Sequence, residues 1–209
     1  MRCKTAYLII NPRLGKKVNA LTGMMAAFSA AGWKTETAIK EFGGHTRKLA
    51  RKAADAGYDL VIGFGGDGTL NQVVNGVMAP KRDGCIVGVI PGGTANVWAH
   101  EIGMPEDPVK ASLLLINSEE CKVDVGHVSV DSLPFSPKKN GEKEQRQSRR
   151  GRHHFLLMAG LGADAAIISQ VPTSLKERIG RAAVALVALK TMPSQHAFPH
   201  RDMVVGRRS

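Results

Sequence analysis

A glycine-rich segment near the middle of the chain combines residue types that bind phosphate. Residues 63–71 read Gly-Phe-Gly-Gly-Asp-Gly-Thr-Leu-Asn and follow a run of apolar residues. Glycines let a backbone turn tightly and approach an anion closely, and the free N–H groups at the start of a following helix attract that anion. Asp67 would repel a bare phosphate, so its carboxylate predicts bound Mg²⁺ or an oriented water or hydroxyl. Thr69 is expected to cap the helix or to donate to a phosphate oxygen.

Two further turns have the same character. Residues 91–96 read Pro-Gly-Gly-Thr-Ala-Asn, and residues 11–16 read Asn-Pro-Arg-Leu-Gly-Lys. Each follows an apolar run typical of a buried strand, and open α/β sheets bind ligands at the carboxyl ends of their strands. One such turn could equally be a plain strand-to-helix connection with local caps. Three of them on one sheet edge favour a nucleotide cleft.

Two common nucleotide fingerprints do not account for these turns. Gly63, Gly65 and Gly68 satisfy the GxGxxG pattern, but that pattern belongs after the first strand of its βαβ unit, with an acidic residue ending the second strand. The glycine spacing before Lys16 does not form a P-loop.

The elements that would position the turns alternate in type. Four segments have the apolar or alternating pattern of strands: residues 6–10, 33–39, 58–64 and 85–90. Five segments have apolar residues at helical spacing: 18–28, 45–56, 70–77, 94–102 and 109–116. Trp98 is expected to pack in the core. Strands alternating with helices predict βαβ units, and hence an α/β domain with a mainly parallel sheet flanked by helices over residues 1–120.

The pattern changes after this domain. Residues 121–130 alternate as in an antiparallel strand, and residues 155–158 form a short apolar strand. Residues 136–154 are polar, basic and without periodicity, which predicts a flexible insertion between these strands. Residues 174–190 have an amphipathic helical pattern. We expect residues 121–209 to form a partial, β-rich second domain.

The charge of the chain is basic and uneven. The 209 residues have a formal net charge of +11, and residues 121–209 carry 15 Lys/Arg against 7 Asp/Glu. This favours phosphate groups or an anionic membrane surface as partners. The basic insertion lacks interleaved aromatic residues, which disfavours nucleic acid. Three cysteines without a CxxC pair, and apolar runs shorter than a signal peptide or membrane span, predict a cytoplasmic protein that touches membranes only peripherally.

Six segments together resemble the lipid kinases with a diacylglycerol-kinase catalytic domain. They are NPRLGK (11–16), GGHTRKLA (43–50), GGDGTLNQVVNG (65–76), GVIPGGTANVWAHEIGMP (88–105), VDVG (123–126) and AGLGADA (159–165). The resemblance covers residues 5–190 and is closest to bacterial soluble members, which are similar to sphingosine kinases. It implies an N-terminal domain, similar to that of NAD kinases, that binds ATP, and a C-terminal β-sandwich that holds the lipid. The γ-phosphate of ATP would pass to a lipid hydroxyl, of diacylglycerol or a sphingoid base, between the two domains.

The resemblance also assigns roles to residues. Asp67 matches an aspartate needed for handling Mg²⁺-nucleotide, and Asp124 matches an aspartate that faces the interdomain cleft. These two are the candidate catalytic residues, and Asp67 is the candidate metal ligand. The expected nucleotide contacts all lie in the three turns: Asn11, Pro12, Gly15, Gly65, Gly66, Asp67, Gly68, Thr69, Asn71, Gly93, Thr94 and Asn96.

Several features depart from the family pattern. Lys40, Gln72 and Val97 stand where the family often has Thr, Glu and Asp. The match fades after Met192, and no Asp-Gly-Glu-type segment, which carries the family's presumed general base, is found in the 209 residues. We therefore expect a truncated or frameshifted chain whose activity depends on that segment. An incomplete second domain would expose apolar faces and favour aggregation or a homodimer.

Two other functions stay open from the sequence alone. An NAD kinase shares the GGDGT loop, although the NPxxG start and the PGGTAN loop favour a lipid kinase. A non-catalytic nucleotide-binding or membrane-surface module fits the lack of the acidic segment.

Overall fold

Four parallel strands form the central sheet of the protein. The computed structural model describes residues 4–79, 84–130 and 151–159. The sheet has the order β2-β1-β3-β4, and every neighbouring pair is parallel. Its strands are β1 (Thr5–Ile10), β2 (Lys34–Ile39), β3 (Leu60–Gly65) and β4 (Ile86–Pro91). The parallel α/β sheet predicted from the alternating pattern is confirmed.

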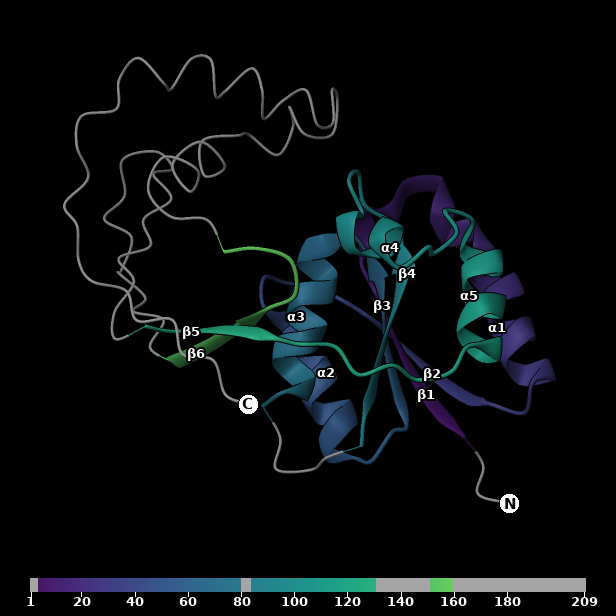
Figure 1. Ribbon diagram of the computed structural model, residues 1–209. Helices are drawn as coiled ribbons and strands as arrows, with labels where there is room; N and C mark the ends of the chain where they lie inside the picture. The colour runs from purple at the N-terminus through teal and green to yellow at the C-terminus, as the bar shows by residue number, and fades with distance from the viewer. Residues whose placement is uncertain (1–3, 80–83, 131–150, 160–209) are drawn as a thin grey trace, which may run out of the picture.

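Helices cover both faces of this sheet (Figure 1). Helices α2 (His45–Asp55) and α3 (Asp67–Val77) pack on one face, and α1 (Leu21–Ala30) and α5 (Pro108–Asn117) pack on the other. The 3₁₀ helix η1 (Pro12–Ala20) and the short helix α4 (Val97–Glu101) lie at the carboxyl edge of the sheet. In the described part of the chain, no helix has both the length and the apolar composition needed to span a bilayer.

Strand β1 shows why the central strands are continuously apolar. Leu8 packs with Phe28 on the α1 and α5 side, whereas its neighbour Ile9 packs with Ala50 and Val73 on the α2 and α3 side. All five side chains are fully buried. Successive side chains of a strand point to opposite faces, so a strand covered on both faces needs apolar residues at every position.

Two of the predicted helices start later than their sequence pattern indicates. The helix expected over residues 18–28 is divided, because residues 12–20 form the 3₁₀ helix η1 and α1 begins at Leu21. The helix expected over residues 94–102 is reduced to α4. Asn96 ends the preceding turn with a left-handed backbone (φ 47°), which an α-helix cannot include.

A two-stranded antiparallel pair lies beside α3 (Figure 1). It consists of β5 (Gly126–Val130) and β6 (Gly151–Phe155). The predicted change to antiparallel structure is confirmed, but the strand bounds differ from the prediction. Residues 121–125 precede β5 and residues 156–158 follow β6, whereas β6 includes residues 151–154, which the sequence assigned to the flexible insertion. Pairing with β5 stabilises a strand that has no apolar periodicity, as tertiary context often overrides composition. The amphipathic segment 174–190 and residues 136–150 of the insertion lie outside the described residues.

The closest approach of α2 and α3 generates a stability prediction. A Cβ on Gly76 would lie 2.6 Å from both Ala50 Cβ and Arg47 O, so Gly76→Ala must push the two helices apart. We expect this overpacking to cost about 1–3 kcal/mol of unfolding free energy, more than the roughly 1 kcal/mol that alanine gains in helix propensity. Urea denaturation measures the difference. Gly68→Ala, in the first turn of the same helix with nothing within 4 Å of the added Cβ, is the control and should not destabilise the protein. Equal stability of the two variants would contradict the prediction.

Candidate active site

The glycine turns that follow β3 and β4 lie in direct contact. Gly92 N–H donates to Gly65 O at 2.9 Å, which continues the β3–β4 pairing beyond the strand ends. A Cβ on Gly93 would lie 2.5 Å from Gly66 Cα, and a Cβ on Gly66 would lie 3.0 Å from Gly93 Cα. Neither position can carry a side chain without displacing the other turn. The two turns therefore form one backbone surface at the carboxyl edge of the sheet.

The turn that follows β1 is tied to this surface. Asn11 N–H donates to Phe64 O at 3.0 Å, and Asn11 Nδ2 donates to Thr69 Oγ1 at 3.4 Å. Leu14 is buried, and a Cβ on Gly92 would collide with its side chain. The predicted convergence of three turns on one sheet edge is confirmed. Since Thr69 is only 6% exposed, its side chain connects two turns rather than standing in solvent.

Asp67 is half-buried at the start of α3 and reaches the next helix. Its Oδ1 accepts a hydrogen bond from Trp98 N–H, in the first turn of α4, at 3.2 Å. The carboxylate thus satisfies one of the unpaired N–H groups at the start of α4 and fixes that helix against α3. Within the described ranges, no hydrogen bond reaches Oδ2 of Asp67. One carboxylate oxygen is therefore structural, and the other is available to a ligand.

The turn after β4 is shaped by a buried amide. Asn96 is 3% exposed. Its Oδ1 accepts from Gly93 N–H at 2.8 Å, and its Nδ2 donates to Gly93 O at 2.9 Å. Asparagine is among the non-glycine residues that best tolerate the left-handed backbone found here. These two hydrogen bonds close the turn between Gly93 and Asn96, and Thr94 within it is exposed next to the glycine surface.

An ion-pair network holds the same turn from outside. Glu106 Oε2 accepts a hydrogen bond from Lys17 Nζ at 2.9 Å. The other carboxylate oxygen, Oε1, accepts a hydrogen bond from Asn96 Nδ2 at 3.4 Å. The same Oε1 lies 3.1 Å from His100 Nε2. Lys17 Nζ also donates to Pro91 O at 3.2 Å. The hydrogen bond from Lys17, helped by the one from Asn96, holds the pKa of Glu106 below its ordinary value. The sequence analysis missed Lys17 and Glu106, because no local pattern connects residues so far apart.

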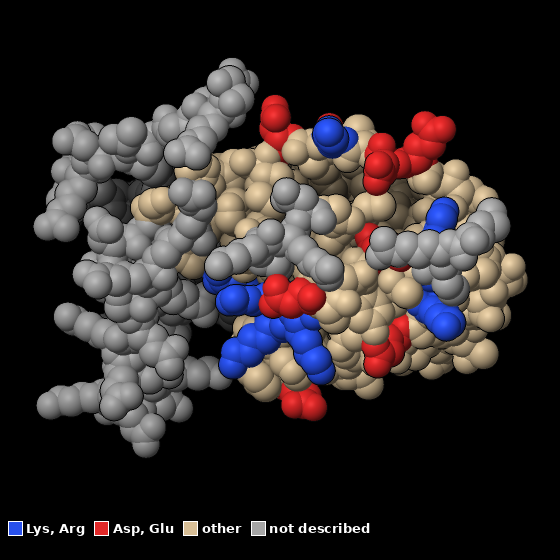
Figure 2. All heavy atoms as spheres, turned by 90° about the horizontal axis from the view of Figure 1, so that it is seen from below, with Lys and Arg blue, Asp and Glu red and all other residues tan. Residues whose placement is uncertain are grey.

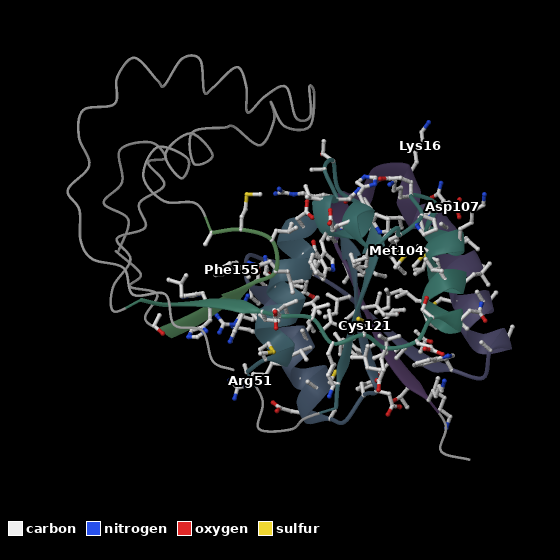
Figure 3. All side chains as sticks on the ribbon, viewed as in Figure 1. Lys16, Arg51, Met104, Asp107, Cys121 and Phe155 are labelled. Carbon is white, nitrogen blue, oxygen red and sulfur yellow. The ribbon has the colours of Figure 1, made fainter. Side chains whose placement is uncertain are left out.

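A cavity of about 280 Å³ opens beside Asp67. It is lined by residues of α3 and α4 and by the segment that ends and follows β6: Asp67, Gly68, Leu70, Asn71, Trp98, Phe155, Leu156, Leu157 and Met158. Figure 3 labels Phe155 where β6 meets α3. Trp98 packs partly buried against the main core, as expected from the sequence, and it also lines this cavity. Most of the lining is apolar, and its polar groups are those of the first turn of α3.

The other predicted site residues are placed as follows. Pro12, Gly15, Gly68 and Asn71 are exposed at the carboxyl edge, so the structure brings all the candidate residues of the three turns together. Asp124 is exposed two residues before β5. Within the described part, no interaction connects Asp124 to the turns, and it does not line the cavity.

Comparison with known proteins places the chain in a family. The profile of the diacylglycerol kinase catalytic domain matches residues 5–128, which include all three turns. The chain belongs to the diacylglycerol kinase catalytic domain family. The resemblance to this family inferred from the sequence segments is thereby confirmed.

Relatives and solved structures agree with this assignment. The diacylglycerol kinase of Bacillus subtilis (strain 168) is 34% identical over 194 residues, which cover 91% of this chain and 56% of the relative. The diacylglycerol kinase of Staphylococcus epidermidis (strain ATCC 12228) is 29% identical over 200 residues, covering 95% and 56%. A diacylglycerol kinase structure from Bacillus anthracis str. Sterne has a TM-score of 0.52 and 26% identity, and the match covers 62% of this chain and 44% of that one. The chain spans about half the length of the curated relatives it matches.

The Glu106 network generates a pH prediction. A carboxyl whose pKa is lowered by folding stabilises the protein above its unfolded pKa, and this contribution is lost as the pH falls through the folded pKa. We expect Glu106→Gln to cost about 0.2–1 kcal/mol near neutral pH, the range for exposed ion pairs. The cost should shrink as the pH falls from about 6 to below about 4. Thermal unfolding across this range measures it.

The matched control is Glu101→Gln, because Glu101 is an exposed carboxylate at the end of α4 for which the structure shows no ion pair among the described residues. It should have little effect at any pH. A destabilisation by Glu106→Gln that stays constant down to acid pH would contradict the ion-pair explanation.

Proposed function

We propose that the chain contributes the ATP-binding part of a lipid kinase, which transfers the γ-phosphate of ATP to the hydroxyl of a lipid alcohol. The observation that carries the proposal is the position of Asp67 and Gly68: they follow the glycine backbone surface directly in the chain, and they line a cavity whose other lining residues are apolar except for Asn71. A phosphate group and an alkyl chain need these two surroundings side by side. The names of the relatives, diacylglycerol kinase, support diacylglycerol as the alcohol.

The three turns are proposed to hold the nucleotide. Gly65, Gly66 and Gly93 let phosphates approach the backbone, and the N–H groups of Asp67 and Gly68 at the start of α3 attract their charge. Thr94 offers an exposed hydroxyl. Asn11, Thr69 and Asn96 act through their hydrogen bonds, which fix the shape of the turns. Pro12, Gly15 and Asn71 complete the proposed nucleotide contacts at the exposed rim.

Asp67 is proposed as the protein ligand for Mg²⁺. In the described ranges, no group of three or more His, Cys, Asp or Glu side chains could hold a metal ion. The site fits Mg²⁺ all the same, because this ion is commonly bound by one or two carboxylates with phosphate oxygens and water completing its coordination. When bound, Mg²⁺ neutralises charge on the phosphates. The chain's own contribution is to hold the phosphates and the alcohol in fixed positions, which is most of what phosphoryl transfer requires.

The cavity is proposed to take the lipid alcohol. Its hydroxyl would lie toward Asp67 and Asn71, and its alkyl part would contact Leu70, Trp98 and Leu157. In this proposal residues 1–120 are the nucleotide-binding domain, and residues 121–209 are part of the lipid-binding domain. Asp124 remains a candidate for the cleft between them.

Location and assembly follow from this function. We propose a cytoplasmic protein that acts in lipid metabolism and contacts anionic membranes transiently, supported by the net charge of +11. Helix α2 exposes Arg47, Lys48, Arg51 and Lys52. Figure 2 shows several Lys and Arg side chains, with Asp and Glu side chains among them, on the face seen from below, on the opposite side from the turns at the top of Figure 1. A homodimer also stays a prediction.

The nucleotide site is tested with Asp67→Asn, which keeps an oxygen to accept the Trp98 N–H. We expect the parent chain to bind ATP·Mg²⁺ at millimolar concentration or below. We expect the variant to bind ATP·Mg²⁺ about tenfold more weakly, yet to bind metal-free ATP no worse than the parent. Isothermal titration calorimetry with and without EDTA measures both affinities. Asp55→Asn, an exposed carboxylate change on α2, is the control. Unchanged ATP·Mg²⁺ affinity in Asp67→Asn would remove Asp67 from the metal role, and no binding by the parent would remove the main support for the function.

The reaction is tested by turnover of γ-labelled ATP. Because no Asp-Gly-Glu-type segment is found in the 209 residues, we expect label to appear in the phosphorylated lipid only at a low rate when the chain is supplied with dioctanoylglycerol or sphingosine in mixed micelles. We expect no label to appear in NADP when the chain is supplied with NAD. Asp67→Asn is the matched negative variant. Binding of ATP without turnover of either lipid would instead support the non-catalytic nucleotide-binding module.

A further inference from the structure

A buried asparagine joins the nucleotide-binding helix to the second part of the chain. Asn75 lies in α3 and is 6% exposed. Its Nδ2 donates to His154 O at 2.8 Å, and its Oδ1 accepts from His154 N–H at 2.8 Å. One side-chain amide therefore pairs with both backbone groups of a single residue in β6. A neighbouring antiparallel strand would make the same two bonds.

The pairing explains how β6 is fixed against α3. In an antiparallel pair, alternate residues direct their N–H and C=O groups away from the partner strand. His154 lies opposite His127 of β5 and directs both groups to Asn75. The amide thus covers part of the strand edge that β5 leaves open, where unpaired backbone groups would otherwise need water or another strand.

This contact is close to both walls of the cavity. The residue that follows His154 is Phe155, the first of the four consecutive residues that form the apolar wall. One helical turn before Asn75 is Asn71, which lines the opposite wall and whose backbone oxygen accepts from Asn75 Nδ2 at 2.8 Å. The same amide group is therefore bonded to an element on each side of the cavity.

We propose that Asn75 is a positioning residue that sets the apolar wall, residues 155–158, against the start of α3 and so gives the lipid cavity its shape. The lipid identity of the cavity rests on the proposed function, whereas the positioning itself does not. A side-chain amide supplies a donor on its nitrogen and an acceptor on its oxygen, as pairing with the C=O and the N–H of one residue requires. An aspartate would place a carboxylate oxygen against His154 O. The glycine turns have their own hydrogen bonds, so the part of the nucleotide site that they form should not depend on Asn75. At the rim, Asn75 Nδ2 also donates to Asn71 Oδ1 at 3.3 Å, so only a small effect on nucleotide affinity is expected.

The first test uses the fluorescence of Trp98 in the full chain. The chain has two tryptophans, and Trp33→Phe leaves Trp98, which lines the cavity, as the only one. In this background we expect Asn75→Asp to raise acrylamide quenching of Trp98 about twofold or more, because the apolar wall moves away. The matched control is Asn117→Asp on α5: Asn117 also donates to the carbonyl four residues earlier, at 2.8 Å, but it is exposed and its amide makes no bond to a strand in the described part. The control should leave quenching unchanged.

The second readout separates positioning from general stability. We expect Asn75→Asp to bind ATP·Mg²⁺ within about twofold of the parent, since the turns are independent of the wall. We expect its affinity for micellar dioctanoylglycerol to fall about tenfold. Unchanged quenching together with unchanged dioctanoylglycerol affinity would overturn the proposal. An equal loss of both affinities would also overturn it, by showing a merely structural role.

Two further results keep the outcomes distinct. If the parent binds no dioctanoylglycerol but Asn75→Asp still raises Trp98 quenching, the positioning role is supported and the lipid assignment is overturned. If Asn75→Asp does not fold, the proposed bond is tested instead by measuring hydrogen exchange of the His154 backbone amide in the unmodified chain. Slow exchange supports the bond to Asn75, and exchange at the rate of an open amide overturns it.

Discussion

The backbone contact between the two glycine turns is the constraint on which the rest of the site depends. Gly66 and Gly93 approach so closely that no side chain fits between them, and the bond from Gly92 to Gly65 extends the sheet by one step. Because β3 and β4 end at the same level, the first residues of α3 and α4 are neighbours. Only in this arrangement can the Asp67 carboxylate reach the Trp98 N–H.

Three polar side chains of the turns are used to build the backbone surface. Asn11, Thr69 and Asn96 bond to one another's turns or to their own, and two of them are nearly fully buried. In the proposed function, donors fixed in this way need no reorganisation when the phosphates bind, which is the physical advantage of a preorganised site. Among the described residues, the groups left for a ligand include backbone N–H groups, Thr94, Asn71 and one oxygen of Asp67.

Helix α3 contacts three other parts of the molecule: the turns, helix α2 and strand β6. Its first residue, Asp67, belongs to the turns, Gly76 gives α2 room to approach, and Asn75 holds β6. A displacement of this helix would therefore change the phosphate end and the apolar wall of the cavity together. In the function proposed above, this shared support has a role, because a lipid kinase must bring a nucleotide and a lipid to one place.

The sequence by itself determined the order of strands and helices, the parallel sheet and the position of the three turns. Apolar periodicity and glycine placement are local signals, and the carboxyl ends of parallel strands must share an edge. Even the family could be inferred from short segments, since close backbone approach to phosphate restricts which residues are allowed there.

Tertiary structure alone decided the start of β6, the length of α4 and the exposure of Trp98 to the cavity. It also decided the partners of Asn75 and Glu106, which lie 79 and 89 residues away along the chain. No periodic pattern in the sequence indicates hydrogen bonds between residues so far apart along the chain. Which polar residues face a ligand and which hold the fold is therefore set by packing.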